Sequence, residues 1–336
     1  MNRQSMQTNP TQGAFETGLH KRLHASAAKL PSPLGGLALA IASLGWTLEN
    51  VLPSANGMAQ LAGSLLGAIL LMALTIKFIL HPKILAEELA HPVLGSVIPT
   101  YAMGWMVVSR CLGNYVAGAG ELLWLLAVAA HLGFLTVFSV HRCRNFSLDS
   151  MVPSWFVPPI GIIVAAVAFP PHGPRVLAEA LLWFGMLAYL VMLPVMLYRL
   201  IFRAAVPQAA QPTLAILAAP ASLSLAGYLS LIPEPSVVII GLLLTLAVLM
   251  TSIIYLAFFH LLRLPFSPGF AAFTFPMVIG ATALYKTHDW LAGQGYVSKL
   301  TQGLSHLANL ELTVAAAVVL FVSAKYLAFY FKQHKS

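Results

Sequence analysis

The sequence predicts an all-α integral membrane protein with ten transmembrane helices, and three observations lead to this fold class. The composition is 59% hydrophobic and only 8% charged, whereas about a quarter of the residues in soluble domains are charged. Ten apolar stretches approach the roughly 20 residues that a helix needs to cross a bilayer. With ten helices, most of the basic residues fall on one side of the membrane, as in other membrane proteins. The short alternating segments of a membrane β-barrel are not seen.

In chain order, the first 30 residues are polar and contain no apolar core, so they do not read as a signal peptide. We expect residues 1–30 to form a cytoplasmic polar tail, either solvated or partly lying on the membrane surface. Residues 31–333 are expected to form one transmembrane domain. The ten predicted helices cover residues 31–53, 58–80, 92–113, 115–140, 152–170, 176–202, 211–233, 236–262, 266–286 and 310–331.

The distribution of lysine and arginine predicts the orientation. With a cytoplasmic N-terminus, ten helices place only Arg110, Arg175, Lys286 and Lys299 of the 18 basic residues on the outer side. Cytoplasmic loops carry an excess of Lys and Arg, so both termini are expected inside the cell. The net charge of +8 follows from this bias. The basic residues are scattered rather than clustered, so nucleic-acid binding is not indicated.

Prolines separate the predicted helices into two kinds. The odd-numbered stretches contain fourteen prolines, whereas the even-numbered stretches contain only Pro194. Proline kinks a helix, and irregular backbone is tolerated at membrane depth only against protein or a water-filled cavity. We therefore expect five helical hairpins around a central pore, with kinked odd helices inside and straight even helices in contact with lipid. The alternative is that the kinks only optimise packing.

The predicted helix breaks lie near the middle of four odd stretches, at Pro99, Pro158, Pro220 and Pro276. The first odd stretch has only Gly45 near its centre. The odd helices run from inside to outside, so the segment after each break would begin at mid-membrane. A helix N-terminus carries about half a positive charge, and several converging there would favour an anion. These five residues are the predicted pore-lining or helix-breaking positions.

Hydroxyl groups and one aromatic ring complete the predicted pore. Small hydroxyl side chains on the odd stretches could donate hydrogen bonds to an anion, or could bond their own backbone instead. These candidates are Ser43, Thr100, Ser154, Ser222 and Thr274. Phe275 lies beside Pro276 at the centre of the ninth stretch. Its ring could close the pore, or it could be a packing residue.

Other chemistries find little support in the sequence. We expect no buried carboxylate that could couple protons or bind a cation, and His131, on an even stretch, is expected to be a buried, hydrogen-bonded residue. Cys111 and Cys143 fall on opposite sides of the membrane, which does not support a disulfide or a cysteine metal site. No metal or cofactor is predicted. The chain has no Walker-type loop, which disfavours an ATP-driven pump. It also has no serine with a base and no cluster of histidines and carboxylates at one depth, which disfavours an enzyme.

Five stretches together resemble the tellurite-resistance/dicarboxylate transporter family, which includes the plant slow anion channels. They are PSPLGGLALAIASLGW, AEELAHPVLGSVIPTYAM, VPSWFVPP, LAAPASLSLAGYLS and AAFTFPMVI. The resemblance implies ten helices in five hairpins around a central pore, usually in a homotrimer. It also implies a phenylalanine plug on the ninth helix, at the second aromatic of an aromatic–small–aromatic run, which is Phe275 in Phe273-Thr274-Phe275.

The resemblance leaves two modes of transport open. Family substrates include small monovalent anions, tellurite, sulfite and four-carbon dicarboxylates. The residues of HPVLGSVIPTYAM and FTFPMVI resemble those of bacterial family members more closely than those of the plant channels. This resemblance implies the inner membrane of a bacterium. We expect an anion channel or a channel-like exporter gated by Phe275. The alternative is a proton-coupled carrier of dicarboxylates, tellurite or sulfite.

Overall fold

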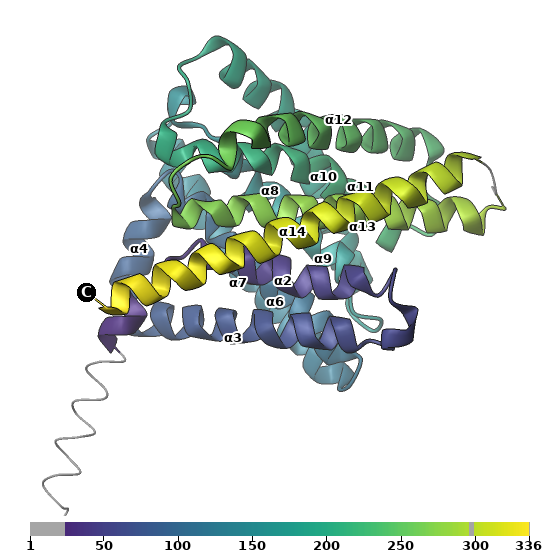
Figure 1. Cartoon of the computed structure of the whole chain (residues 1–336), viewed down its shortest axis with the longest axis horizontal. Helices are drawn as coiled ribbons and strands as arrows, with labels where there is room; N and C mark the ends of the chain where they lie inside the picture. Colours follow the sequence, from purple (N-terminus) through teal and green to yellow (C-terminus); the bar gives the residue numbers. More distant parts are fainter. Residues whose placement is uncertain (1–23, 296–298, 336) are drawn as a thin grey trace, which may run out of the picture.

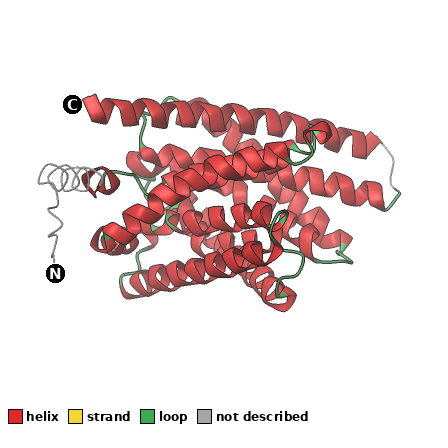
Figure 2. Cartoon of the chain, turned by 90° about the horizontal axis from the view of Figure 1, so that it is seen from below, coloured by secondary structure: helices red, strands yellow, loops and turns green. Residues whose placement is uncertain are grey.

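The computed structural model describes residues 24–295 and 299–335 (Figure 1). The prediction for the start of the polar tail, residues 1–23, lies outside this range. The described residues form helices, turns and loops without a strand (Figure 2). Most helices run along the long axis of the molecule, and the first described residues lie at the same end as the C-terminal end of α14, Lys299–Lys335 (Figure 1).

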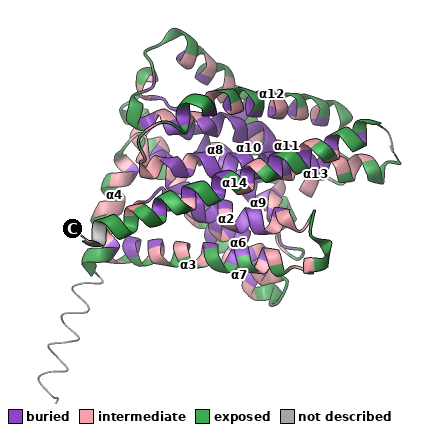
Figure 3. Ribbon diagram, in the orientation of Figure 1, coloured by how far each residue is buried: buried purple, intermediate pink, exposed green. Residues whose placement is uncertain are grey.

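Long continuous helices form the outside of this bundle. Between 28% and 39% of the residues in their most apolar windows are buried, and their exposed side chains are mainly leucine, isoleucine, valine and phenylalanine. Figure 3 shows exposed residues along α3, α12 and α14 and buried residues toward the centre. This surface suits contact with lipid tails. Besides α14, these helices are α3 (Met58–Leu80), α7 (Ala117–Arg144), α10 (Arg175–Phe202) and α12 (Val237–Leu261).

Shorter and mixed helical segments lie inside the bundle. In the spans Gln208–Leu231 and Pro268–Gly293, 83% and 78% of the most apolar window is buried. For these two odd stretches, the predicted inner position is confirmed. The inner elements are α2 (Leu34–Leu48), α5 (Leu94–Val97), α6 (Pro99–Gly113), η3 (Pro153–Phe156), α8 (Val157–Ile160), η4 (Gly161–Ile163), α9 (Val164–Val167), η5 (Gln208–Ala218), α11 (Ala219–Leu231), η6 (Pro268–Phe273) and α13 (Thr274–Gly293).

The described residues contain seven helices that are long and apolar enough to cross a membrane. An eighth span results if α4 (Pro82–Ala90) is counted with the segment Leu94–Gly113, from which it is bent by 105°. The segments Leu34–Leu48 and Pro153–Val167 are apolar but shorter. The predicted class, an all-helical protein with many membrane spans, is therefore confirmed, and a total of ten crossings stays a prediction.

The central prolines lie at junctions between helical segments, and the helical backbone continues through each junction. Each lies in the first turn of an α-helical segment, where its missing N–H is tolerated. In η5 and η6, which precede two of them, the backbone is a 3-10 helix. At these junctions the N–H of Ala219 bonds the carbonyl of Ile216, and the N–H of Thr274 bonds that of Ala271. The prolines concerned are Pro99, Pro158, Pro220 and Pro276.

This geometry corrects the expectation of free helix ends at mid-membrane. A 3-10 helix joins an α-helix without leaving a full turn of donors unpaired. The N–H groups of Ala219 and Thr274 are accordingly already bonded. Because these N–H groups are bonded, they add little to the positive potential that isolated helix N-termini would create.

Gly45 does not break its helix, which corrects the prediction for this position. Helix α2 runs without interruption from Leu34 to Leu48. A Cβ atom at Gly45 would lie 2.4 Å from the carbonyl oxygen of Ala59 and 2.9 Å from the Cα atom of Gly63. Glycine here permits the backbones of α2 and α3 to meet, which is the usual role of small residues between membrane helices.

We expect Gly45→Ala to destabilise the protein, because its methyl group would overlap the backbone of α3. Overpacking of this kind costs about 1–3 kcal/mol. The measurement is thermal unfolding of the purified protein in detergent. Gly241→Ala is the matched control, because a Cβ atom there meets nothing within 4 Å. Equal melting temperatures for the two variants would contradict this account of Gly45.

Candidate functional site

A cavity of about 400 Å³ lies among the N-terminal halves of the inner segments, and we call it the large cavity. Each of the five odd stretches contributes to its wall. Representative lining residues are Pro33, Thr100, Gly161, Ala219 and Ala272. Most of the wall is made of small or apolar side chains, so the space is kept open by residue size rather than by a network of polar groups.

A second cavity of about 110 Å³, the small cavity, is lined by the C-terminal parts of inner helices. Helix α2 contributes Ser43, Trp46 and Thr47, which share one helical face, and Asn50 lies in the turn after the helix ends. Helix α13 contributes Phe275, Ile279, Thr282, Lys286 and Asp289, which repeat every three or four residues and so also share one face. The polar residues on these two faces make the small cavity more hydrophilic than the large one.

Phe275 belongs to the wall of both cavities, and no other residue in the described part of the chain does. Its side chain is 7% exposed. The ring therefore lies at the boundary between the two spaces, in the wall of α13. An apolar ring at a constriction excludes water and hydrated ions.

Phe273 has different surroundings, although it lies only two residues away. It is fully buried and lines neither cavity. Its ring packs edge-on against Phe258 of α12, with centroids 5.6 Å apart, and against Phe270 at 4.8 Å. The two phenylalanines thus offer a matched pair, one between cavities and one in the packed core.

Four predicted pore residues besides Phe275 line a cavity. Pro220, Pro276 and Thr100 line the large cavity, and Ser43 lines the small one. The Thr100 hydroxyl donates to the carbonyl of Val97 at 2.7 Å, so its proton is used by the nearby backbone and is not offered to the cavity. The Ser43 hydroxyl has no such bond with any described residue and is available to the cavity.

The remaining candidates lie in the packed interior. Ser154 accepts a hydrogen bond from Ser96 at 2.7 Å, Ser222 donates to the carbonyl of Ala218 at 3.1 Å, and Thr274 donates to that of Ala271 at 2.7 Å. These three hydroxyls are fully buried, and neither cavity includes them. The same is true of Pro99, Pro158 and Gly45.

His131 joins an outer helix to one of the predicted breaks. Its Nε2 atom lies 2.8 Å from the carbonyl oxygen of Pro158, and its side chain is fully buried. The interpretation of His131 as a buried, hydrogen-bonded residue is confirmed for Nε2, while Nδ1 has no hydrogen-bond partner. Helix α7 therefore supplies a bond to backbone at the Pro158 junction.

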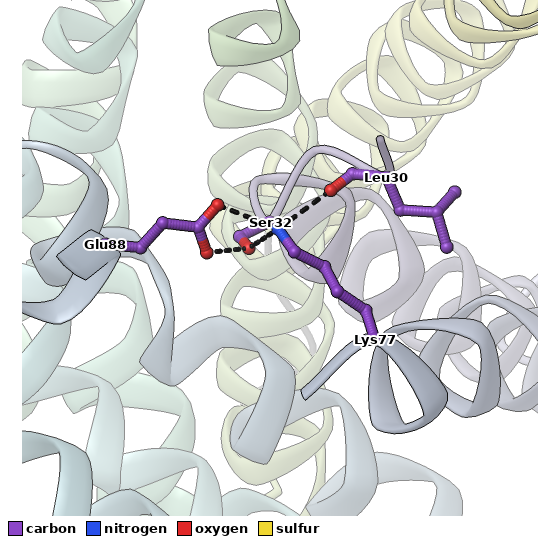
Figure 4. Close-up of polar contacts among 4 residues, drawn as sticks. All are labelled: Leu30, Ser32, Lys77 and Glu88. Atoms are coloured by element: carbon purple, nitrogen blue, oxygen red, sulfur yellow. Dashed lines mark hydrogen bonds and ion pairs between the residues drawn. The ribbon is translucent and has the colours of Figure 1, made fainter. Parts of the chain in front are cut away.

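An ion-pair cluster at one wall of the large cavity was not identified from the sequence. The Lys77 ammonium lies 2.7 Å from Glu88 Oε1, 2.8 Å from Ser32 Oγ and 2.9 Å from the carbonyl oxygen of Leu30 (Figure 4). Ser32 donates to the other Glu88 oxygen at 2.5 Å. The cluster fastens α3, α4 and the start of α2 together. Removing one partner of a buried pair costs about 3–5 kcal/mol. We therefore interpret this cluster as one that stabilises the packing of these segments.

Ser32 and Glu88 are themselves part of the cavity wall, whereas Lys77 lies behind them. The negative charge of Glu88 is thus neutralised by Lys77 of the same chain. The signal in the sequence was weak, since the three residues belong to three separate segments. A lysine near the end of an apolar stretch followed by the polar run AEELAH was the only hint.

Glu311 overturns the expectation that no carboxylate is buried. Helix α14 begins at Lys299, eleven residues before the predicted span, because Leu304, Ala308 and Leu312 continue its buried face. Glu311 therefore falls within the helix and is 3% exposed. Its Oε2 atom has no hydrogen-bond partner and lies 2.5 Å from where a Cβ atom at Gly280 of α13 would be.

Comparison with known proteins agrees with this architecture. Residues 29–325 match the family described as voltage-dependent anion channel. Two proteins of Methanocaldococcus jannaschii are similar: uncharacterized transporter MJ0762 is 29% identical, with 63% of this chain and 70% of the relative covered. Uncharacterized transporter MJ0576 is 28% identical, with 63% and 69% covered. The chain therefore belongs to the voltage-dependent anion channel family, among channels and transporters of anions rather than among enzymes.

Proposed function

We propose that this chain is an anion channel, or a channel-like transporter, that passes small anions through a path formed by the large and small cavities. The observation that carries the proposal is the position of Phe275, which alone borders both spaces. In this proposal, the ring closes the path between the two cavities. Movement of the ring joins them without disturbing a hydrogen bond or an ion pair.

The walls of the path support transport rather than tight capture. The large cavity is mainly apolar, with Glu88 as its charged residue and Lys77 already neutralising that charge. Conduction requires binding that is weak enough for the ion to leave. No group of three or more His, Cys, Asp or Glu side chains that could hold a metal occurs among the described residues. In the small cavity, the Ser43 hydroxyl would then act on the anion.

We further propose ten crossings, arranged as five hairpins in one domain over residues 31–333. The packing of α2 on α3, α6 on α7, α11 on α12 and α13 on α14 supports this layout, as does that of α10 on α8 and α9. The two shorter apolar segments would be the remaining inner helices. Both cavities are lined by one chain, so each copy in the homotrimer implied by the family resemblance would have its own pore.

We expect Phe275→Ala to raise anion conductance, because the substitution removes the obstruction without removing a charge. Flux increases roughly tenfold for each 1.4 kcal/mol by which the barrier falls. The preference for anions over cations should remain. The measurement is current in a planar bilayer or an oocyte membrane at matched expression, across a panel of anions.

Phe273→Ala is the matched control, since Phe273 packs against Phe258 and lines neither cavity. It should lower stability but not raise conductance. If Phe275→Ala conducts no more than the wild type, or if Phe273→Ala is the variant that opens, then Phe275 is only a packing residue.

The proposed orientation places both termini in the cytoplasm, probed by cysteine labelling with a reagent that does not cross membranes. After replacing the exposed Cys143 with serine, single cysteines are introduced at exposed positions in three connections. We expect labelling from outside the cell at Ser54 and Gln294, and none at Asn145. Labelling of Asn145 alone would reverse the orientation.

Proton-coupled transport of dicarboxylates, tellurite or sulfite is the second candidate function, and Glu311 is the observation that favours it. An ionisable residue inside a membrane protein commonly marks a proton or ion pathway. Glu311 is buried within α14 against Gly280 of α13, the helix that carries Phe275. Its carboxylate forms no hydrogen bond or ion pair with the described residues, so it could accept a proton without breaking a contact.

A flux assay that records protons and substrate together separates these two functions. For a channel, we expect anion flux down its gradient with no fixed proton stoichiometry, in the wild type and in Glu311→Gln alike. For a carrier, protons would accompany the substrate in the wild type, and Glu311→Gln would abolish their movement. Glu234→Gln, at an exposed carboxylate, should behave as the wild type in either case.

A further inference from the structure

The charged groups of the two cavities differ in whether they are already paired. Glu88, in the large cavity, is bonded to Lys77 and Ser32. Asp289, in the small cavity, lies 3.0 Å from His288 Nδ1, and its side chain is 66% exposed. Lys286 lines the small cavity and forms no hydrogen bond or ion pair with any described residue. Among the described residues, its ammonium is therefore held by no direct contact, although Asp289 attracts it and Arg110 repels it at longer range.

The hydroxyls and amides around Lys286 are mostly committed elsewhere. Thr47 donates to the carbonyl of Ser43 at 2.9 Å and lies 2.8 Å from the Thr282 hydroxyl. Tyr285 donates to Asn309 Oδ1 at 2.6 Å, and Asn50 uses one amide hydrogen for the carbonyl of Thr47. The Ser43 hydroxyl is not engaged in this way. The donors that remain for a ligand are the Lys286 ammonium and the Ser43 hydroxyl, with the second amide hydrogen of Asn50 and the indole N–H of Trp46 on the same wall.

We propose that Lys286 and Ser43 form a binding site for a small monovalent anion in the small cavity, whose wall also includes Phe275. This inference rests on the proposed function in that the anion is taken to be the one that the path conducts. Charge-assisted hydrogen bonds from an ammonium are stronger than neutral ones, and a half-buried lysine without a partner is costly until an anion neutralises it.

Charge and size define the class of ligand. The Lys286 ammonium interacts electrostatically with the Asp289 carboxylate and the Arg110 guanidinium. Together these three groups carry one net positive charge, which favours an anion with a single negative charge. The cavity of about 110 Å³ is well below the range of roughly 300–1,000 Å³ that holds larger organic ligands. A halide or nitrate suits this space, whereas a four-carbon dicarboxylate would need more positive charge and more room.

Trp46 lines the same cavity and provides a direct readout, because iodide quenches tryptophan fluorescence on contact. Iodide is titrated into the purified, detergent-solubilised protein, and Trp46→Phe identifies the share of the signal that arises at the site. We expect a saturable component in the wild type that nitrate reverses and succinate does not. In Lys286→Met, the iodide concentration at half-saturation should rise by about tenfold or more, the effect of losing one charge-assisted contact.

Matched variants separate site binding from general charge and from misfolding. Lys299→Met removes an exposed positive charge on the same predicted side of the membrane and should titrate as the wild type. Lys286→Arg should restore saturation, and Ser43→Ala should weaken it by about threefold. The proposal is overturned if Lys286→Met and Lys299→Met reach half-saturation at the same iodide concentration. It is also overturned if succinate displaces iodide at the concentration that suffices for nitrate.

The same titration in Phe275→Ala distinguishes this site from the proposed gate. The Lys286 site lies three helical turns from position 275 on α13, so iodide should still saturate in that variant. If conductance does not rise in Phe275→Ala but Lys286→Met loses saturation, the gate fails and the binding site stands. If conductance rises and the Lys286→Met titration matches that of Lys299→Met, the site fails and the gate stands.

Discussion

A lipid bilayer offers backbone N–H and C=O groups no partner of its own, and the arrangement of this protein follows from that constraint. Regular α-helices such as α3 and α12 bond all their interior backbone groups and can face lipid. Segments with 3-10 backbone and proline, such as η5 and η6, leave some groups poorly satisfied. They therefore lie inside, where other protein segments surround them and cavities remain. The hydrogen bond from His131 to the backbone at Pro158 is one case in which an outer helix completes an inner one.

The path proposed for the anion depends on the absence of large side chains and of an accessible positive charge from the wall of the large cavity. Small residues such as Gly161 and Ala272 leave space that larger side chains would fill. Lys77 is held away from this space by Glu88 and Ser32, so it does not offer a strong binding site there. In the proposed path, an anion would meet weak interactions in the large cavity and the Lys286 ammonium in the small one.

Hydropathy and proline placement were enough to predict the membrane class and the inner position of two odd stretches, because these depend on local sequence. Features that depend on contacts between distant segments were not accessible. Gly45 resembles a helix break until its contact with Gly63 is known. Glu311 resembles a residue near the membrane surface until α14 is seen to begin at Lys299. The bond between Lys77 and Glu88 joins two helices whose relative direction the sequence does not specify.

The 3-10 form of η6 has a consequence for the placement of side chains along the large cavity. In a 3-10 helix, residues three apart lie directly above one another, whereas in an α-helix they drift around the axis. Gly269, Ala272 and Phe275 are three apart and all line this cavity. Gly269 and Ala272 both lie within η6 and stack in this way, and Phe275 lies in the first turn of α13, which continues directly from η6. The direction of the ring is thus set by the number of residues in η6 as much as by their identity, since one residue inserted there would turn α13 relative to Gly269 by about a third of a circle.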